Sequence, residues 1–213
     1  MSINKLNQSE RTSGLRAIFS LPFFYEGFQT AIGAKAFRNF IVENYIKPND
    51  GAKVLDVGCG TADILDHLPN VEYVGIDHSP QYVARARERF GHRATFLTNS
   101  AERASLIEYD DFDIALALGV LHHLDDHTAE GTLQFVKEKT RRGGSFVSVD
   151  PTFTEDQNLI AKILAKNDRG QHVRTVADTK RLLTETLPST EVSVHHNLLR
   201  VPYSHVVCVS KID

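Results

Sequence analysis

The stretch Val54-Leu55-Asp56-Val57-Gly58-Cys59-Gly60-Thr61 decides the fold. Its apolar residues predict a short buried strand, and a helix is predicted over Thr61–Leu68 after the glycines. Gly58 and Gly60 allow the backbone to turn sharply and leave no Cβ in the way of a bound ligand. A buried strand, a glycine turn and a helix thus follow one another, although a lone G-x-G is weak evidence because many turns contain it.

Strands and helices alternate beyond this stretch, as apolar runs and helical spacing of apolar residues indicate. The predicted strands are Tyr73–Asp77, Ala94–Leu97, Phe112–Leu118 and Ser145–Val149, the predicted helices are Pro80–Phe90, Ala101–Ile107 and Thr128–Lys139, and a turn is predicted at Arg142-Gly143-Gly144. Continuous apolar strands in such an alternation favour a parallel sheet that helices cover on both faces.

The carboxyl-terminal part ends differently. After predicted helices over Gln157–Lys166 and Val176–Leu187, two strands are expected at Glu191–His196 and His205–Ser210. The loop between these strands is too short for a crossover helix, so they should pair antiparallel. The expected fold class is therefore α/β, with a Rossmann-like seven-stranded mixed sheet, helices on both faces and an antiparallel C-terminal strand pair.

Residues 1–50 precede the first strand and are expected to form an N-terminal helical lid or cap. Two helices are predicted there, over Leu15–Thr30 and Ala34–Lys47. Residues 51–213 then form the main domain, in which 151–175 is expected to be an insertion.

Composition bounds the function. The chain has 213 residues, 41% of them apolar and 24% charged, which are ordinary globular values. With a net charge of −3 and no basic stripe, a nucleic-acid partner is not expected. Two cysteines without a CxxC motif argue against a zinc site or a disulfide framework, and no metal is predicted. No leader and no membrane span are recognised, so a cytoplasmic location is expected, and the oligomeric state stays open.

A second element narrows the ligand. Asp77 ends a predicted strand 19 residues after Gly58, a spacing that suits a carboxylate accepting hydrogen bonds from ribose hydroxyls. The two elements together predict an adenosine-containing ligand at the carboxyl edge of the sheet. A dinucleotide fingerprint would have a third glycine where this chain has Asp63, and that carboxylate would repel a pyrophosphate. A phosphate-free ligand is therefore favoured.

On these residues, the chain resembles class I S-adenosylmethionine (SAM)-dependent methyltransferases of the small-molecule type. The resemblance covers roughly Lys53–Val149 and the last two strands. In addition to the opening stretch, it rests on Tyr73-Val74-Gly75-Ile76-Asp77-His78-Ser79, Asn99-Ser100-Ala101-Glu102, Phe112-Asp113-Ile114-Ala115-Leu116-Ala117-Leu118-Gly119-Val120-Leu121-His122-His123-Leu124 and Gly143-Gly144-Ser145-Phe146-Val147. The order of these motifs is specific, although each alone is not.

The resemblance implies SAM as the cofactor and gives roles around its methionine moiety. Asp56, Gly58 and Gly60 would shape the pocket, and Gly119 would pass beneath the methionine. Tyr25 lies on the first predicted helix, which either packs on the sheet or closes over SAM so that Tyr25 reaches its carboxylate.

The resemblance also gives roles around the adenosine. Asp77 would hold the ribose, and His78 would flank the adenine. Ser100 and Ala101 would face the adenine edge. Families of this type often have Asp where this chain has Ser100, and Ser accepts a hydrogen bond less strongly, which weakens that assignment.

Candidate acceptor residues follow the fourth and fifth strands. A base helps methyl transfer when the acceptor must lose a proton, and histidine titrates near neutrality. His122 and His172 are the candidate catalytic bases. The alternative for His122 is capping or packing of the following helix, and the alternative for His172 is a solvated turn. His123, Arg169 and Arg174 are candidate acceptor-binding residues, because arginine can grip a carboxylate or phosphate with two hydrogen bonds.

The predicted function is transfer of a methyl group from SAM to a small-molecule acceptor. Oxygen or carbon is favoured over nitrogen, because the Asn/Asp-Pro-Pro-aromatic motif of many amino-group methyltransferases is absent. Two alternatives stay open. A nicotinamide-dependent oxidoreductase is disfavoured by Asp63 and the final strand pair, and a non-catalytic binding protein is disfavoured by the intact set of predicted cofactor residues.

Overall fold

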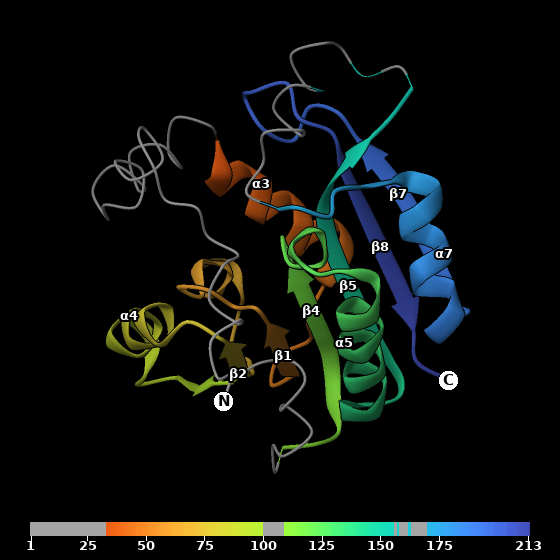
Figure 1. Cartoon of the computed structure of the whole chain (residues 1–213). Helices are drawn as coiled ribbons and strands as arrows, with labels where there is room; N and C mark the ends of the chain where they lie inside the picture. The colour runs from red at the N-terminus through yellow and green to blue at the C-terminus, as the bar shows by residue number, and fades with distance from the viewer. Residues whose placement is uncertain (1–32, 100–108, 156, 158–161, 163–169) are drawn as a thin grey trace, which may run out of the picture.

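A computed structural model of the chain describes residues 33–99, 109–155, 157, 162 and 170–213 (Figure 1). The strands are β1 (Lys53–Val57), β2 (Glu72–Asp77), β3 (Ala94–Thr98), β4 (Phe112–Leu118), β5 (Thr140–Phe153), β6 (Arg174–Thr175), β7 (Thr190–His195) and β8 (His205–Lys211). The helices are α3 (Ala34–Ile41), α4 (Pro80–Phe90), α5 (Asp126–Lys139) and α7 (Val176–Thr186), with a π-helical turn η1 (Val42–Ile46) and 3-10 turns η2 (Asp63–His67) and η4 (Leu121–His123).

The sheet has the expected mixed topology. Its strand order is β3-β2-β1-β4-β5-β8-β7, in which β1 to β5 run parallel and β8 runs antiparallel to both β5 and β7. The predicted seven-stranded sheet with an antiparallel C-terminal pair is therefore confirmed. A two-residue strand, β6, adds to it by pairing with the end of β5 and was not predicted. The loop 196–204 joins β7 to β8 at the edge where β5 ends.

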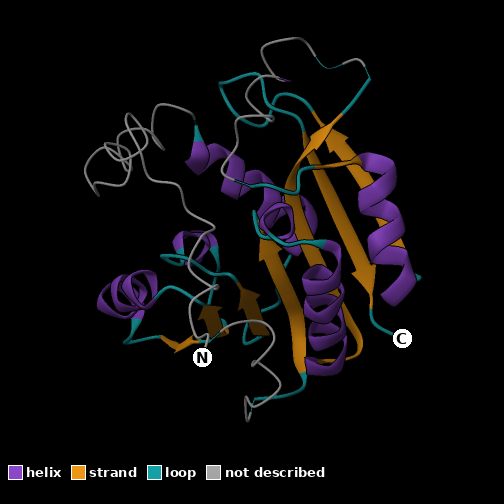
Figure 2. Cartoon of the chain, in the orientation of Figure 1, coloured by secondary structure: helices purple, strands orange, loops and turns teal. Residues whose placement is uncertain are grey.

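Helices cover both faces of the sheet, as Figure 2 shows. On one face, α5 and α7 pack side chains such as Leu133 and Leu183 against strand residues that include Leu55. On the other face, α3, η1 and α4 bury a second cluster that includes Ile41 and Leu116. Strand residues are buried on both faces, which explains why β1 and β4 read as continuous apolar runs.

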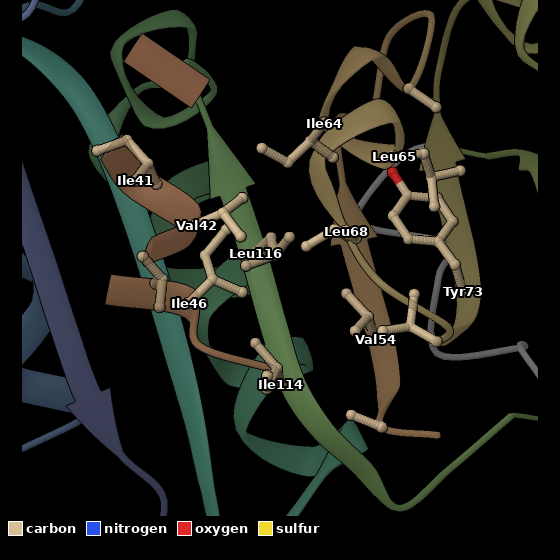
Figure 3. Packing of buried hydrophobic residues seen from close by; sticks show 14 of the residues in the cluster. Ile41, Val42, Ile46, Val54, Ile64, Leu65, Leu68, Tyr73, Ile114 and Leu116 are labelled. Atoms are coloured by element: carbon tan, nitrogen blue, oxygen red, sulfur yellow. The ribbon is translucent and has the colours of Figure 1, made fainter. Parts of the chain in front are cut away.

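The second cluster includes the described end of the N-terminal segment. Figure 3 shows Val42 and Ile46 beside Ile114 and Leu116 of β4, and all four are buried. Burying a side chain of this size contributes about 1.5–3 kcal/mol. The part of residues 1–50 that the structure describes therefore shares a core with the sheet.

Two local predictions were wrong. The helix predicted over Thr61–Leu68 is only the 3-10 turn η2, because Ala62 before it has a left-handed backbone (φ 57°) and Leu68 after it is extended. The turn predicted at Arg142-Gly143-Gly144 lies inside the long strand β5, where the register against β4 shifts.

The predicted helices Leu15–Thr30 and Ala101–Ile107 lie outside the described residues, as does Gln157–Lys166 except for Gln157 and Lys162. Within the described part of the chain, no helix is long and apolar enough to cross a membrane.

Candidate active site

The glycine bend after β1 lies against the end of β2. The backbone N–H groups of Gly58 and Cys59 both donate to the carbonyl oxygen of Ile76, at 2.7 and 3.0 Å. Gly58 has φ 71°, and a Cβ there would lie 2.6 Å from Cγ2 of Val120, in the loop after β4. Only glycine satisfies both the backbone conformation and this contact. The bend thus joins three strand ends.

Two further glycines border open space at the same edge. Gly60 and Gly119 have φ values of 55° and 72°. A Cβ on Gly60 would meet no atom of the described residues within 4 Å, and a Cβ on Gly119 would meet only Cε1 of His122, at 3.8 Å. These positions leave the backbone accessible to a ligand.

Asp77 connects the end of β2 to the glycine bend. Its Oδ2 accepts a hydrogen bond from the Gly60 N–H at 2.9 Å, and its Oδ1 accepts one from the Ser79 N–H at 2.8 Å. Each carboxylate oxygen has a second lone pair for a ligand hydroxyl. His78 follows with a largely exposed ring, its Nδ1 3.5 Å from Oδ1 of Asp77.

Asp56 is a buried carboxyl group with one unsatisfied oxygen. The Tyr73 hydroxyl donates to its Oδ2 at 2.5 Å, while Oδ1 has no hydrogen-bond partner among the described residues. Burial raises the pKa of Asp56 from 3.8 to about 7; the Tyr73 hydrogen bond lowers it, and the negative charge of Asp77 raises it further. A positive charge beside Asp56 would stabilise its ionised form.

His122, in the turn after β4, and Asp150, near the end of β5, form a buried pair. Nδ1 of His122 lies 2.7 Å from Oδ1 of Asp150, and the backbone N–H of His122 donates to the same oxygen at 3.1 Å. The ring of His123 lies 4.0 Å from that of His122, between centroids. A Cβ on Gly170 would lie only 2.0 Å from Cδ2 of His122, so the backbone at Gly170 abuts the ring.

The segment 170–174 is attached to the turn η4. The His172 N–H donates to the carbonyl oxygen of His122 at 2.9 Å. The Arg174 guanidinium donates to the carbonyl oxygens of Leu121 and Leu124, at 2.7 and 2.8 Å, and pairs with Asp126 at 2.7 Å. Arg174, predicted to bind the acceptor, thus has its hydrogen bonds directed into the protein.

A cavity of about 10 Å³ lies beside the buried pair, lined by His122, Asp150, His172 and Arg174 among others. Oδ2 of Asp150 has no hydrogen-bond partner among the described residues. A volume of this size holds about one water molecule. A larger cavity of about 450 Å³ opens at the opposite edge of the sheet, and its described lining includes none of the predicted site residues.

The structure brings together the described members of the predicted set. Asp56, Gly58, Gly60, Asp77, His78, Gly119, His122, His123, His172 and Arg174 all lie at or just beyond the carboxyl edge of the parallel strands. Tyr25, Ser100, Ala101 and Arg169 lie outside the described residues, and their roles stay predictions. No group of three potential metal ligands occurs in the described parts of the chain.

Sequence reasoning missed Asp150 and Gly170. Asp150 directly follows Val149, the last residue of β5 that pairs with β4, and Asp77 likewise ends β2, so its position after an apolar strand was an available signal. Nothing in the local sequence distinguishes Gly170 from an ordinary loop glycine.

Asp63 is compensated by two positive charges, which corrects an expectation from the sequence. Its carboxylate pairs with the guanidinium of Arg38 at 3.1 Å and with that of Arg89. Repulsion of a pyrophosphate by Asp63 is therefore a weaker objection to a dinucleotide than the sequence indicated.

Comparison with known proteins agrees with this geometry. Residues 54–144 match the family described as "Methyltransferase domain". An uncharacterized methyltransferase of Anoxybacillus flavithermus is 25% identical over 173 residues, which are 78% of this chain and 73% of that protein. The eEF1A lysine and N-terminal methyltransferase of Bos taurus is 29% identical over 139 residues, but this chain covers only 20% of its length.

The fold is also found among solved structures. A TehB-like SAM-dependent methyltransferase from Corynebacterium glutamicum superposes with a TM-score of 0.63 over 90% of this chain and 97% of that chain, at 17% identity. This likeness concerns the fold, and the likeness to the methyltransferase family comes from the domain match over residues 54–144. The resemblance inferred from the sequence motifs is confirmed. Residues 54–144 thus match the methyltransferase-domain family, and the chain has the fold of class I SAM-dependent methyltransferases.

Proposed function

We propose that this protein transfers a methyl group from SAM to a small-molecule acceptor, at oxygen or at an acidic carbon. The observation that carries the proposal is the contact between Asp77 and the glycine bend, through the Gly60 N–H. That contact brings a carboxylate with remaining lone pairs next to a backbone that a ligand can approach.

The described residues fit SAM as the cofactor. When bound, SAM supplies a methyl group activated on a positively charged sulfur. Asp77 would accept hydrogen bonds from the ribose hydroxyls, while Gly60 and Gly119 would leave room for the ligand. The unsatisfied Oδ1 of Asp56 is a buried acceptor that would favour a positively charged ligand.

A small acceptor that loses a proton agrees best with the second half of the site. His122 stands beyond β4, next to Gly119, where it could take that proton. The segment 170–174 would border the acceptor pocket, with His123 and Arg169 as contacts. Arg174 is left out of this proposal because its guanidinium is engaged by η4 and Asp126.

A protein amino group is the second candidate acceptor. Its support is the name of the Bos taurus relative, which specifies lysine and the N-terminus. The match covers a fifth of that relative, so its substrate-binding parts need not have counterparts here. The other two sequence-based alternatives, an oxidoreductase and a non-catalytic binder, have the domain match against them.

Calorimetry with S-adenosylhomocysteine tests the cofactor proposal. We expect binding with a Kd on the order of 1 μM, which corresponds to about −8 kcal/mol. Asp77→Asn should weaken binding by roughly 10- to 100-fold, since a hydrogen bond to a charged group contributes about 1.5–3 kcal/mol. Asp111→Asn is the matched control, because Asp111 is exposed and its φ of 60° suits asparagine.

The acceptor class is tested separately with radiolabelled SAM. Phenols and hydroxy acids would report a small acceptor, and a lysine-containing peptide would report the alternative. A folded protein that gives no heat with S-adenosylhomocysteine but binds NAD would overturn the cofactor proposal. Labelling of the peptide alone would overturn the small-molecule proposal.

A further inference from the structure

The turn η4, which carries His122, is held from several sides. Asp150 accepts two hydrogen bonds from His122, one from the backbone N–H and one at the ring. The His172 N–H donates to the His122 carbonyl oxygen, and Arg174 holds the carbonyl oxygens of Leu121 and Leu124. The backbone on both sides of His122 is therefore fixed by groups that are distant in sequence.

The bond to Asp150 selects one tautomer of the neutral ring. An ionised carboxylate only accepts hydrogen bonds, so Nδ1 of His122 must carry the hydrogen of the 2.7 Å contact. In the neutral imidazole the other nitrogen, Nε2, then has the lone pair. Both side chains are buried, so leaving the carboxylate without a hydrogen from Nδ1 would cost free energy, whereas the tautomer that donates from Nδ1 is stabilised.

The ring is also oriented by its carbon atoms. Cδ2 lies against the backbone of Gly170, and Cε1 is directed to the open side of Gly119. Nε2 is bonded to both of these carbons, so it lies on the ring edge between the two glycines. Gly119 borders the space assigned to the cofactor, and Gly170 belongs to the segment assigned to the acceptor.

We propose that Asp150, Gly170 and Arg174 are positioning residues that hold His122 with Nε2 as the proton acceptor of the reaction. This inference rests on the proposed methyl transfer. The acceptor oxygen forms a bond to the methyl carbon, the carbon–sulfur bond breaks with its electron pair staying on sulfur, and the hydroxyl proton moves to Nε2. Asp150 then stabilises the positive charge on the ring, and solvent takes the proton after release.

The proposal defines the acceptor class more closely. A base fixed by a carboxylate is of use only for an acceptor that must lose a proton, such as a phenol, another hydroxyl or a protonated amino group. The proposal also gives a reason for an arginine at position 174, because the several N–H donors of one guanidinium reach two carbonyl oxygens and a carboxylate at once.

The first test observes the ring directly and needs no acceptor. Long-range ¹H–¹⁵N spectra of protein labelled in histidine are recorded at about pH 9, well above the ordinary titration range of histidine. His122→Gln assigns the signal. We expect a hydrogen on Nδ1 and none on Nε2 in the wild type. In Asp150→Ala, the ring should become a mixture of both tautomers.

The second test separates positioning from folding. Gly170→Ala puts a methyl group 2.0 Å from Cδ2 of His122, so it should shift the His122 ring signals. Gly131→Ala is the matched control, because a Cβ on Gly131 meets nothing within 4 Å among the described residues. Arg174→Lys keeps the positive charge but cannot donate to both carbonyl oxygens and Asp126 at once, so the turn η4 should be held less firmly and the same signals should broaden. His127→Gln is the control for His122→Gln, because His127 is an exposed histidine on α5.

The third test links the ring to the reaction with a phenol as acceptor. His122→Gln should lower the rate of methyl transfer by roughly 10²- to 10⁴-fold, and Asp150→Asn by a smaller factor, with S-adenosylhomocysteine affinity unchanged in both. An Nε2-protonated neutral ring in the wild type, or full activity of His122→Gln, would overturn the inference. If the wild-type protein does not bind S-adenosylhomocysteine, the proposed function is overturned instead, while the tautomer of His122 measured in the first test is unaffected.

Discussion

Replacement of the buried Asp56 by asparagine should stabilise the protein, relative to the wild type, increasingly as the pH rises. The pKa of Asp56 is about 7 in the folded protein against an ordinary value of 3.8. Because the pKa is raised, Asp56 stays protonated up to a higher pH in the folded state than in the unfolded state. The stability that Asp56 contributes is therefore complete below about pH 4, declines as the pH rises to about 7, and is constant above that.

The size of this effect follows from the shift. One pKa unit corresponds to about 1.4 kcal/mol, so the interval from 3.8 to about 7 amounts to roughly 4 kcal/mol. The asparagine side chain would keep an oxygen that accepts the hydrogen bond from the Tyr73 hydroxyl but would carry no charge. The difference in free energy of unfolding, Asp56→Asn minus wild type, should increase by several kcal/mol between about pH 4 and about pH 8.

Urea unfolding of both proteins at intervals across this pH range measures the difference. Asp113→Asn is the matched control with the opposite sign, because hydrogen bonds from the Lys53 N–H and the Arg141 guanidinium lower the pKa of Asp113. Its replacement should reduce stability above about pH 4. A difference for Asp56→Asn that stays flat with pH would refute the reasoning about the buried charge.

Three further predictions concern the bend, a helix cap and a thiol. Gly58→Ala forces an L-residue into φ 71° and places its Cβ 2.6 Å from Val120, so it should cost more than about 2 kcal/mol in urea unfolding and abolish S-adenosylhomocysteine binding. Gly51 also has a positive φ, 75°, but a Cβ there would meet no atom of the described residues within 4 Å, so Gly51→Ala should cost only about 1–2 kcal/mol; equal losses would contradict the steric argument. Ser79→Ala removes the N-cap of α4 and should cost about 1 kcal/mol by the same measurement, with no loss as the contrary result. Burial raises the pKa of Cys208 to about 12, so iodoacetamide should modify this thiol far more slowly in the folded protein than in urea; similar rates would show that the site opens readily.

The sequence predicted the sheet well because its signals are local. Pro80–Phe90 and Phe112–Leu118 were assigned their observed bounds, since Ser79 and Pro80 mark one start and a buried apolar run defines the other element. The antiparallel final pair followed from a short loop alone. The helix over Thr61–Leu68 failed because a left-handed residue at Ala62 is a property of the bend that apolar spacing does not reveal.

The candidate site was predictable in its cofactor half and less so in its acceptor half. Asp77 and the glycine bend meet because parallel strands bring their carboxyl ends to one edge. The pair of His122 and Asp150 depends on how far β5 continues beyond β4, which the sequence around each residue does not specify. Arg174 was assigned to the acceptor because arginine suits anions, but carbonyl oxygens compete for the same donors.

The reversal of β8 has a consequence for how such a protein can be altered. The first residue of β8, His205, pairs with Pro151, two residues after Val149, the last residue of β5 that pairs with β4. The loop 196–204 of the β7–β8 hairpin therefore lies at the carboxyl edge of the parallel strands. A hairpin loop tolerates exchange far better than a crossover connection, whose helix is part of a core. Exchanging this loop between related proteins should therefore leave the sheet and every described residue assigned to SAM in place.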